Sequence, residues 1–472
     1  MKKIAAILAA LLMLLAVFVP MAAAVQNGEQ IRGIDTHEIG VVRELNNELN
    51  KIQSPDVGIS PNKMAIYTTG VSARGMQFPR LIDYQREKIP DIENMVKYTI
   101  KLQVGPQKYD IVTLTSFIKE TKPYRTKEKK VLAMSTGQGL TYKLYEERAI
   151  ELAKGSVNVV VIGRREDNIR SYPPLDGAEL TEMNEIMSGW SEEMYLQDMY
   201  WSVVTSRLHT AMLSRADIKS IEVIGWGHSL GERFWKDYLE NGYDKKSFGD
   251  IKLFMAVDMA TEYDLIYGDL IKTQEGKCRE IEGVIADGKY YSEEGAMILY
   301  ITSLAYNPET RDQYFDFPGM PELSGYTNIE VFRMMNFMTW QFGSQFTPDF
   351  HNLDGDLNSL YDVDEQKMMV LILNGGAVAY TPLFEDEMVA CQLGNVLGYE
   401  SKPENIDTEV IYYGLYGGFG HYGEHAIRLI GASKDFPVIT KVFNTGGHAS
   451  ILFVDSKKVD RFWQEVQDDI RR

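Results

Sequence analysis

The sequence reads Gly227-His228-Ser229-Leu230-Gly231 between an apolar run at 221–225 and a helix-like segment that begins at Glu232. A strand, a Gly-x-Ser-x-Gly turn and a helix form the context in which a serine hydroxyl becomes a nucleophile. The two glycines remove Cβ atoms that would collide in so sharp a turn. We therefore predict that Ser229 stands exposed at the carboxyl end of a strand, above the free N–H groups of a helix. The alternative is a small-residue turn that only lets a helix pack closely on a sheet.

Strand-like and helix-like segments alternate on both sides of this turn. The predicted buried strands are 130–134, 157–162, 251–257, 368–373 and 437–443, and the predicted helices include 142–153, 191–214, a helix after Pro382 and 456–470. This alternation is typical of a parallel sheet in an α/β fold. Two further runs, 96–104 and 109–115, alternate around a Gly-Pro break and predict an antiparallel hairpin.

A stretch rich in aromatic residues and methionine interrupts the alternation from about 262 to 366 and predicts an inserted, mainly helical cap. The chain of 472 residues is long enough for one large domain with an insertion, or for two domains. The predicted organisation is a signal peptide at 1–24, an N-terminal extension at 25–95, an α/β core at 96–261 and 367–472, and the cap at 262–366.

The first residues have the pattern of a secretory signal peptide. A basic Lys2-Lys3 pair precedes an almost wholly apolar run at 4–19, and three alanines at 22–24 supply small residues for cleavage. The alternative is an uncleaved membrane anchor, although the apolar run is short for a transmembrane span. We therefore expect a secreted or cell-surface protein. In that setting Cys278 and Cys391 could form a disulfide, but two free buried thiols are equally compatible with the sequence.

The net charge of −18 argues against nucleic acid as a partner, because an acidic surface repels phosphate backbones. Two patterns resemble metal sites. Asp354, Asp356, Asn358, Asp362 and Glu365 have the spacing of a calcium loop, but Ser359 stands where glycine is required. His421 and His425, with Glu424 between them, could share a helical face, but no fourth zinc ligand is in view. We expect no metal and no cofactor.

A serine hydroxyl needs a base within hydrogen-bond reach, and His448 is the best candidate. It follows the last predicted strand on a Gly-Gly loop, and strand ends in this architecture share one edge of the sheet. The alternative is an ordinary loop histidine. The rival histidines are His209, His228, His421 and His425.

On these features the chain resembles the α/β-hydrolase superfamily over roughly 96–260 and 367–470. The resemblance rests on the serine turn, the order of Ser229 before His448, the strand-to-loop segment at 131–139 and Gly163-Arg164-Arg165. It implies a mostly parallel α/β-hydrolase sheet and a Ser–acid–His triad. It also implies a hydrolase, most often acting on esters, without fixing the substrate.

The triad acid is where the sequence departs from the family pattern. The family usually places it after the strand predicted here at 368–373, yet 374–382 contains no aspartate or glutamate. The family has a second position for the acid, after the next strand beyond the serine turn and its helix. In this chain Asp258 occupies that position. We predict that Asp258 orients His448 and stabilises its protonated form. Asp258 could instead be a capping or loop residue, and Glu385 and Asp386 are weaker alternatives.

The resemblance also implies an oxyanion hole made of backbone N–H groups. Leu230, just after the nucleophile, and Gln138, in the loop after 131–134, are the predicted donors. Family members often carry His-Gly in that loop, whereas this chain has Thr136-Gly137. A further departure is Glu232, where a second small residue is common.

These features predict an exported serine hydrolase that cleaves a small-molecule or lipid-like ester through an acyl-enzyme, with the aromatic cap over its pocket. The alternative is a non-catalytic relative that binds ligands or acts at the cell surface. The sequence does not separate an esterase from a peptidase and says nothing of oligomeric state.

Overall fold

A computed structural model describes residues 36–52, 79–155, 157–171, 174–242, 251–259, 268–317, 319–339, 364–399, 402, 405–417, 438–448, 450–453 and 457–472. Three of the segments singled out in the sequence lie wholly or partly outside these residues. They are the predicted signal peptide, the pair His421 and His425, and the calcium-like pattern, of which only Glu365 is described. No helix of the described stretches is long and apolar enough to cross a bilayer.

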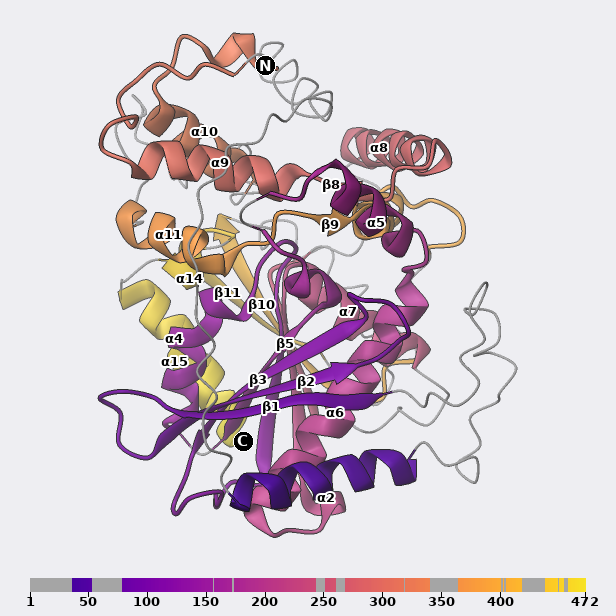
Figure 1. The fold of residues 1–472 in the computed structure, drawn as a ribbon, viewed down its shortest axis with the longest axis vertical. Coiled ribbons are helices and arrows are strands. Elements are labelled where there is room, and N and C mark those ends of the chain that lie inside the picture. The colour runs from indigo at the N-terminus through magenta and orange to yellow at the C-terminus, as the bar shows by residue number, and fades with distance from the viewer. Residues whose placement is uncertain are drawn as a thin grey trace.

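One sheet of nine strands organises the described residues (Figure 1). Its strand order is β1-β2-β3-β5-β4-β6-β7-β10-β11. The strands are β1 (Arg80–Lys88), β2 (Met95–Gln103), β3 (Ile111–Lys119), β4 (Lys130–Ser135), β5 (Asn158–Gly163), β6 (Glu222–His228), β7 (Leu253–Val257), β10 (Glu409–Gly417) and β11 (Val438–Gly447). The first three strands run antiparallel, β3 runs antiparallel to β5, and every pairing from β5 to β11 is parallel. The predicted hairpin and the predicted mostly parallel sheet are both confirmed.

Helices cover both faces of this sheet. The longer ones are α2 (Thr36–Ile52), α4 (Tyr142–Ala153), α5 (Gly177–Met187), α6 (Glu192–Ser214), α7 (Leu230–Asn241), α8 (Gly268–Ala286), α9 (Glu294–Tyr306), α10 (Asn328–Thr339), α12 (Leu383–Leu393) and α15 (Lys457–Arg471). Successive residues of a strand point to opposite faces. Leu132 and Met134 therefore join a core with α4 and α15, while Val131 and Ala133 join a core with α6 and α7. This layering fixes the carboxyl ends of the parallel strands at one edge.

The prediction of a strand at 368–373 is wrong. These residues lie in α11 (Glu365–Leu371) and in the helical turn Ile372–Gly376 that continues it. A short apolar run fits a buried helix as well as a strand. The helix is favoured here because the Asp364 side chain caps its start by accepting from the Lys367 N–H at 2.9 Å.

The sheet resumes instead at β10, which the sequence analysis missed. Its residues, Glu-Val-Ile-Tyr-Tyr-Gly-Leu-Tyr-Gly, are rich in the β-branched and aromatic types that favour strands. β10 pairs with β7 on one side and β11 on the other. The insertion was predicted to end at 366 because a strand was expected directly after it, but a helix follows instead. At the other end of the sheet, β1 lies within the segment 25–95 that was predicted to be an extension.

Between β7 and β10 the described chain is mainly helical. Helices α8, α9 and α10 all lie at the end of the molecule opposite α2, with α9 packed on α10 and α8 apart from them beside α12 (Figure 1). Backbone hydrogen bonds tie this region to the sheet edge, because Ala296 of α9 donates to Ala379 and Val378 donates to Gly139, which follows β4. The two-residue strands β8 (Tyr291–Ser292) and β9 (Thr381–Pro382) add a second, antiparallel link.

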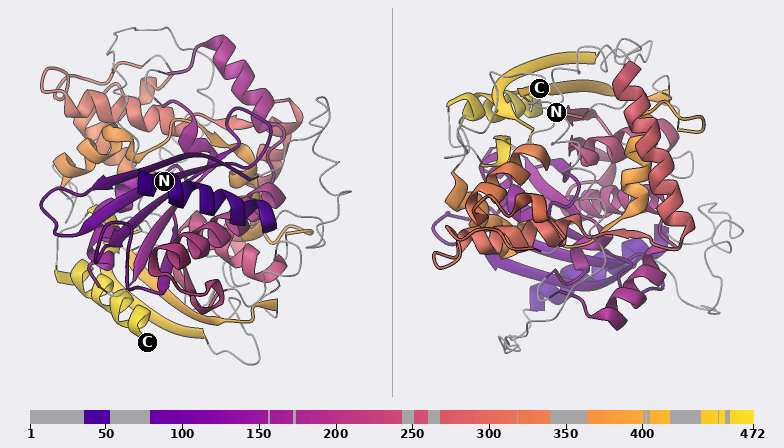
Figure 2. Two further views of the ribbon diagram at one scale, coloured as in Figure 1. Left: turned by 60° about the horizontal axis from the view of Figure 1, so that its bottom comes forward. Right: turned by 90° about the horizontal axis from the view of Figure 1, so that it is seen from above.

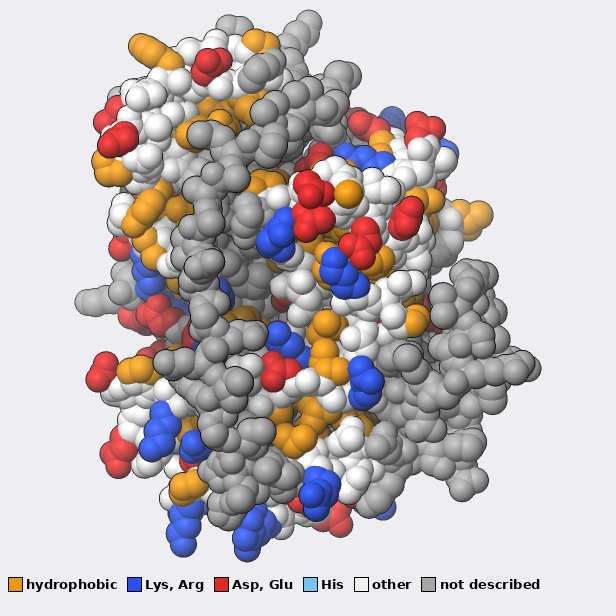
Figure 3. Space-filling model, viewed as in Figure 1, with side chains coloured by type: hydrophobic (Ala, Val, Ile, Leu, Met, Phe, Trp, Pro, Cys, Tyr) orange, Lys and Arg blue, Asp and Glu red, His pale blue; other side chains and the backbone are white. Residues whose placement is uncertain are grey.

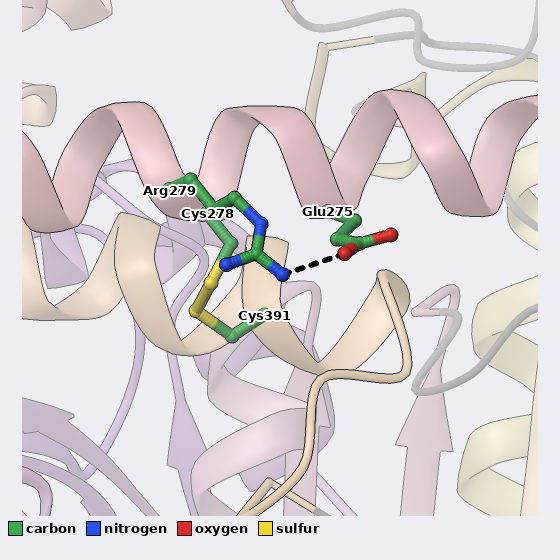
Figure 4. Close-up of a disulfide and its surroundings, with 4 residues drawn as sticks. All are labelled: Glu275, Cys278, Arg279 and Cys391. Carbon is green, nitrogen blue, oxygen red and sulfur yellow. Dashed lines mark hydrogen bonds and ion pairs between the residues drawn. A yellow bond between two sulfur atoms is a disulfide. The ribbon is translucent and has the colours of Figure 1, made fainter.

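A disulfide between Cys278 and Cys391 holds α8 against α12 (Figure 4). The two helices lie side by side along the molecule (Figure 2), and both cysteines are fully buried. The sequence allowed either a disulfide or two free thiols, and the structure contains the disulfide.

Acidic and basic side chains of the described residues are interspersed on the face drawn in Figure 3, so they form no continuous basic surface there.

Candidate active site

Ser229 occupies a strained turn between β6 and α7. Its φ of 55° and ψ of −129° lie in a region that residues other than glycine rarely adopt. The flanking glycines are required sterically. A Cβ on Gly227 would lie 2.5 Å from Glu232 N and Cα, and one on Gly231 would lie 2.6 Å from Thr136 O. Ser229 is partly exposed although both neighbours are buried. Strain of this kind is typical of functional residues.

The start of α7 lies directly behind the serine. The carbonyl of Ser229 accepts from the Glu232 N–H at 2.9 Å, which closes the first turn of the helix. Leu230 is the first helical residue, and the first N–H groups of a helix have no partner within it. The N–H of the predicted donor Leu230 therefore has no acceptor within the helix and lies at the positive end of the helix dipole.

His448 meets Asp258 at the same edge of the sheet. The Nδ1 atom of His448 lies 2.6 Å from Oδ2 of Asp258, and both residues are buried. A carboxylate at Nδ1 is the arrangement that orients an imidazole so that its other nitrogen can act as a base. The structure thus brings together the two side chains that were predicted to act as a pair.

Asp258 is held rigidly by the neighbouring strand. It follows β7 with a φ of 51°, its N–H donates to Tyr413 O at 3.0 Å, and its Oδ1 accepts from Leu415 N–H at 2.8 Å. Both anchors belong to β10. Of the alternative acids, Glu385 lies 3.9 Å from the Arg164 guanidinium, and Asp386 accepts from the Gln138 amide at 2.9 Å. The carboxylate hydrogen-bonded to Nδ1 of His448 is that of Asp258.

Sheet register places Ser229 and the residue that follows β11, His448, at the same edge of the sheet. His228 pairs with Val257 and Val257 pairs with Tyr413, so β6 and β7 end level with Tyr413. From there β10 continues four residues to Gly417, which pairs with Gly447 at the end of β11. The Ser229 N–H donates to Val257 O at 2.9 Å. His228, the residue before the serine, stacks on the His448 ring with centroids 4.7 Å apart.

The loop after β4 is clamped so that one of its N–H groups faces away from the clamp. Arg164 donates to the carbonyl oxygens of Thr136 at 3.3 Å and of Gly137 at 2.8 Å. In a planar trans peptide the N–H points opposite to the C=O. The Gln138 N–H, which shares a peptide with the Gly137 carbonyl, therefore points away from Arg164. Thr136 donates from Oγ1 to Leu140 O at 2.8 Å and closes the loop where family members often carry histidine.

Arg164 is itself held in a buried group of carboxylates. Its guanidinium bonds Glu166 and lies near Glu385, and all three side chains are almost fully buried. Burial raises the pKa of Glu385 well above its usual value, and Arg164 only partly opposes that shift. Arg164 belongs to the segment that carries the family resemblance, but no role in the site was predicted for it. Its place directly after a buried strand was the available signal.

The other candidates from the sequence lie elsewhere or play other parts. His209 is buried in α6, bonds the Tyr84 hydroxyl at 3.0 Å, and has its pKa lowered to about 3 by burial. Glu365, from the calcium-like pattern, pairs with Arg333 at 2.8 Å. The described residues that group as metal ligands, Cys278, Glu282 and Cys391, include both cysteines of the disulfide.

No family model matches the sequence, and no curated protein matches it. Among solved structures, a provisionally assigned lipase from Sulfolobus solfataricus is 13% identical with a TM-score of 0.52, covering 83% of this chain and 100% of that one.

Two further solved structures superpose less well, with TM-scores below 0.5. A thermostable carboxyl esterase from Bacillus coagulans is 10% identical with a TM-score of 0.45, over 83% of this chain and 98% of that one. A monoglyceride lipase variant from Saccharomyces cerevisiae is 12% identical with a TM-score of 0.35, over 86% and 97%. At such identities the likeness concerns the fold alone.

Proposed function

We propose that this chain, whose fold is that of the α/β-hydrolase superfamily, is an exported serine hydrolase. Ser229 is its nucleophile, His448 its general base and acid, and Asp258 the carboxylate that orients His448. The observation that carries the proposal is the strained backbone of Ser229 at the sheet edge where Asp258 and His448 are hydrogen-bonded, with His228 of the serine turn stacked on His448. A residue in such a backbone conformation costs about 1–3 kcal/mol, which a turn with only a packing role does not require.

The proposed reaction passes through an acyl-enzyme. The hydroxyl oxygen of Ser229 attacks the ester carbonyl while Nε2 of His448 takes its proton. The negative carbonyl oxygen is stabilised by the N–H groups of Leu230 and Gln138. The tetrahedral intermediate collapses, and His448 returns the proton to the departing alcohol. Water then attacks the acyl-serine by the same proton transfers and releases the carboxylic acid.

Asp258 contributes charge as well as position. Its buried carboxylate accepts from Nδ1 of His448, so the proton on that ring is fixed at Nδ1 and the opposite nitrogen presents a lone pair. When His448 takes the serine proton, the adjacent negative charge stabilises the imidazolium. Arg164 supports the opposite side of the site by holding the loop that carries Gln138.

Two features support the finer parts of the proposal. The Cys278–Cys391 disulfide accords with an oxidising compartment, as expected for an exported protein. The substrate class, a small or lipid-like ester, rests on the aromatic residues of the helical segment that stands over the sheet edge, and Tyr300, Phe315 and Phe317 pack together there. A likeness to a provisionally assigned lipase accords with this class.

The test uses the purified mature protein, short p-nitrophenyl esters and a fluorophosphonate probe. We expect Ser229→Ala to abolish turnover and labelling, and peptide mapping to place the probe on Ser229. Ser220→Ala, at the exposed opposite end of β6, is the matched control and should behave like wild type. Labelling at another residue, or full activity of Ser229→Ala, would contradict the proposal. A folded wild-type protein that reacts with no serine probe would favour the non-catalytic alternative.

A further inference from the structure

A chain of hydrogen bonds runs beneath the candidate nucleophile, between two main-chain groups on opposite sides of it. The Gly137 N–H donates to the Tyr145 hydroxyl oxygen at 3.0 Å. That oxygen lies 2.8 Å from Nδ1 of His228, and Nε2 of His228 lies 3.0 Å from the carbonyl oxygen of His448. Gly137 belongs to the oxyanion loop, whereas His448 is the proposed base.

The main-chain groups at the two ends assign every proton of the chain. A carbonyl oxygen can only accept, so Nε2 of His228 carries a hydrogen and donates to His448 O. A neutral imidazole then has a lone pair on Nδ1, which accepts from the Tyr145 hydroxyl. The tyrosine oxygen keeps a lone pair for the Gly137 N–H. Only one assignment of donors and acceptors satisfies all four polar groups. These groups are fully or almost fully buried.

Burial keeps this arrangement neutral. It lowers the pKa of His228 well below the usual value, and the neighbouring His448 lowers it further. A second proton on His228 would put an N–H where the Tyr145 hydroxyl already donates. His228 also supports His448 through its face, since their rings are stacked at 30° with centroids 4.7 Å apart.

We propose that Tyr145 and His228 are positioning residues, which hold the oxyanion loop and the histidine loop in register with each other across Ser229. This inference rests on the proposed function. Arg164 fixes the loop by its carbonyls, whereas the Tyr145–His228 chain links that loop to the histidine by hydrogen bonds between described residues. Removing one of its members leaves a buried partner unsatisfied and frees the two loops to shift independently.

The first variant is Tyr145→Phe, which removes one hydroxyl from a packed ring. We expect kcat on a p-nitrophenyl ester to fall by about 10- to 100-fold with KM nearly unchanged, because displacements well under 1 Å impair proton transfer and oxyanion binding. Tyr142→Phe is the matched control. It lies on the same helix, and its ring faces Lys97 rather than the site. Equal kcat values for the two variants, with both folded, would overturn the inference.

The second test separates hydrogen bonding from packing at His228. Glutamine offers one acceptor and one donor, so His228→Gln should retain much of the activity, whereas His228→Phe keeps an aromatic ring without polar atoms and should resemble Tyr145→Phe. The pH at half-maximal kcat/KM should be unshifted in His228→Gln, because the imidazole of His228 stays neutral. Loss of the acid limb in that variant would instead make His228 the base and overturn the inference.

The outcomes remain distinguishable from failure of the proposed function. If wild type does not label at Ser229, the proposed function fails. The variants are then compared only by their melting temperatures. If wild type labels and turns over, a fluorophosphonate labelling rate lowered in parallel with kcat in Tyr145→Phe supports the positioning role. Should Tyr145→Phe not fold, the His228→Gln and His228→Phe pair decides, and equal activity of those two would contradict the inference.

Discussion

His448 and Asp258 are joined at 2.6 Å although 190 residues of sequence separate them. The carboxylate of Asp258 is fully buried, and its other oxygen accepts from the Leu415 N–H. A carboxylate so confined cannot turn away from the imidazole without losing a backbone hydrogen bond. The pair therefore gives His448 one orientation and one tautomer, which is what a proton carrier beside a serine requires.

Asp258→Asn should lower kcat on a p-nitrophenyl ester by on the order of 10³-fold or more while leaving the fold intact. The amide keeps the size of the side chain, but it removes the negative charge and can present an N–H that selects the wrong tautomer of His448. Asp176→Asn is the control, because asparagine is as good an N-cap as aspartate and Asp176 caps α5. Activity of Asp258→Asn within a few-fold of wild type would remove Asp258 from the triad.

Gly231→Ala should prevent correct folding of the turn that carries Ser229. An added Cβ would lie 2.5 Å from the carbonyl carbon of Ser135 and 2.6 Å from Thr136 O, and neither backbone group can move without opening the β4 loop. We expect a loss of soluble protein, or a lower melting temperature together with lost activity. Gly276→Ala, in open space on α8, should instead stabilise by about 0.5–1 kcal/mol. A stable, active Gly231→Ala protein would show that the turn has more room than this geometry allows.

The sequence predicted the parallel part of the sheet because that part depends on local patterns. Apolar runs of strand length alternate there with helices whose apolar residues recur at helical spacing, as at 130–134 and 142–153. The serine turn added a steric requirement that few local structures satisfy. Asp258 could be placed because it directly follows a strand, at a position that the family resemblance also pointed to.

The prediction was wrong where a short apolar run fits two structures. The run at 368–373 became part of a helix because Asp364 caps it, and the mistake hid β10, the strand that anchors Asp258. The lack of an acid in 374–382 therefore does not bear on the usual family position, since 368–373 is not a strand. The roles of Tyr145 and Arg164 could not be predicted, because their contacts join segments whose spacing only the folded sheet defines.

Removing the Cys278–Cys391 disulfide should destabilise the packing of α8 on α12. The bridge closes a separation of 113 residues, and loss of a bridge of this kind costs about 2–5 kcal/mol. The double variant Cys278→Ser/Cys391→Ser should melt several degrees lower than wild type. Reductant should shift wild type toward the variant and leave the variant unchanged. Identical melting of both proteins with and without reductant would show that the bridge adds no stability.

Glu232 is a buried carboxyl group on the nucleophile helix. It is fully buried, and neither of its oxygens has a hydrogen-bond partner among the described residues. Burial raises the pKa of Glu232 to about 8, although Lys236 and Arg233 oppose the shift. An unfolded glutamate ionises near 4.5. Between these two values the unfolded chain gives up a proton that the folded chain retains, so stability falls as pH rises.

Glu232→Gln should therefore raise the free energy of unfolding most at neutral to mildly alkaline pH. Each unit above 4.5 costs wild type about 1.4 kcal/mol, so the difference should be roughly 3 kcal/mol at pH 7 and should shrink toward pH 5. Urea titrations across this range measure it, and the exposed Glu322→Gln serves as the control. A difference between Glu232→Gln and wild type that is constant with pH would mean that Glu232 is ionised in the folded protein, stabilised by the cationic residues of α7.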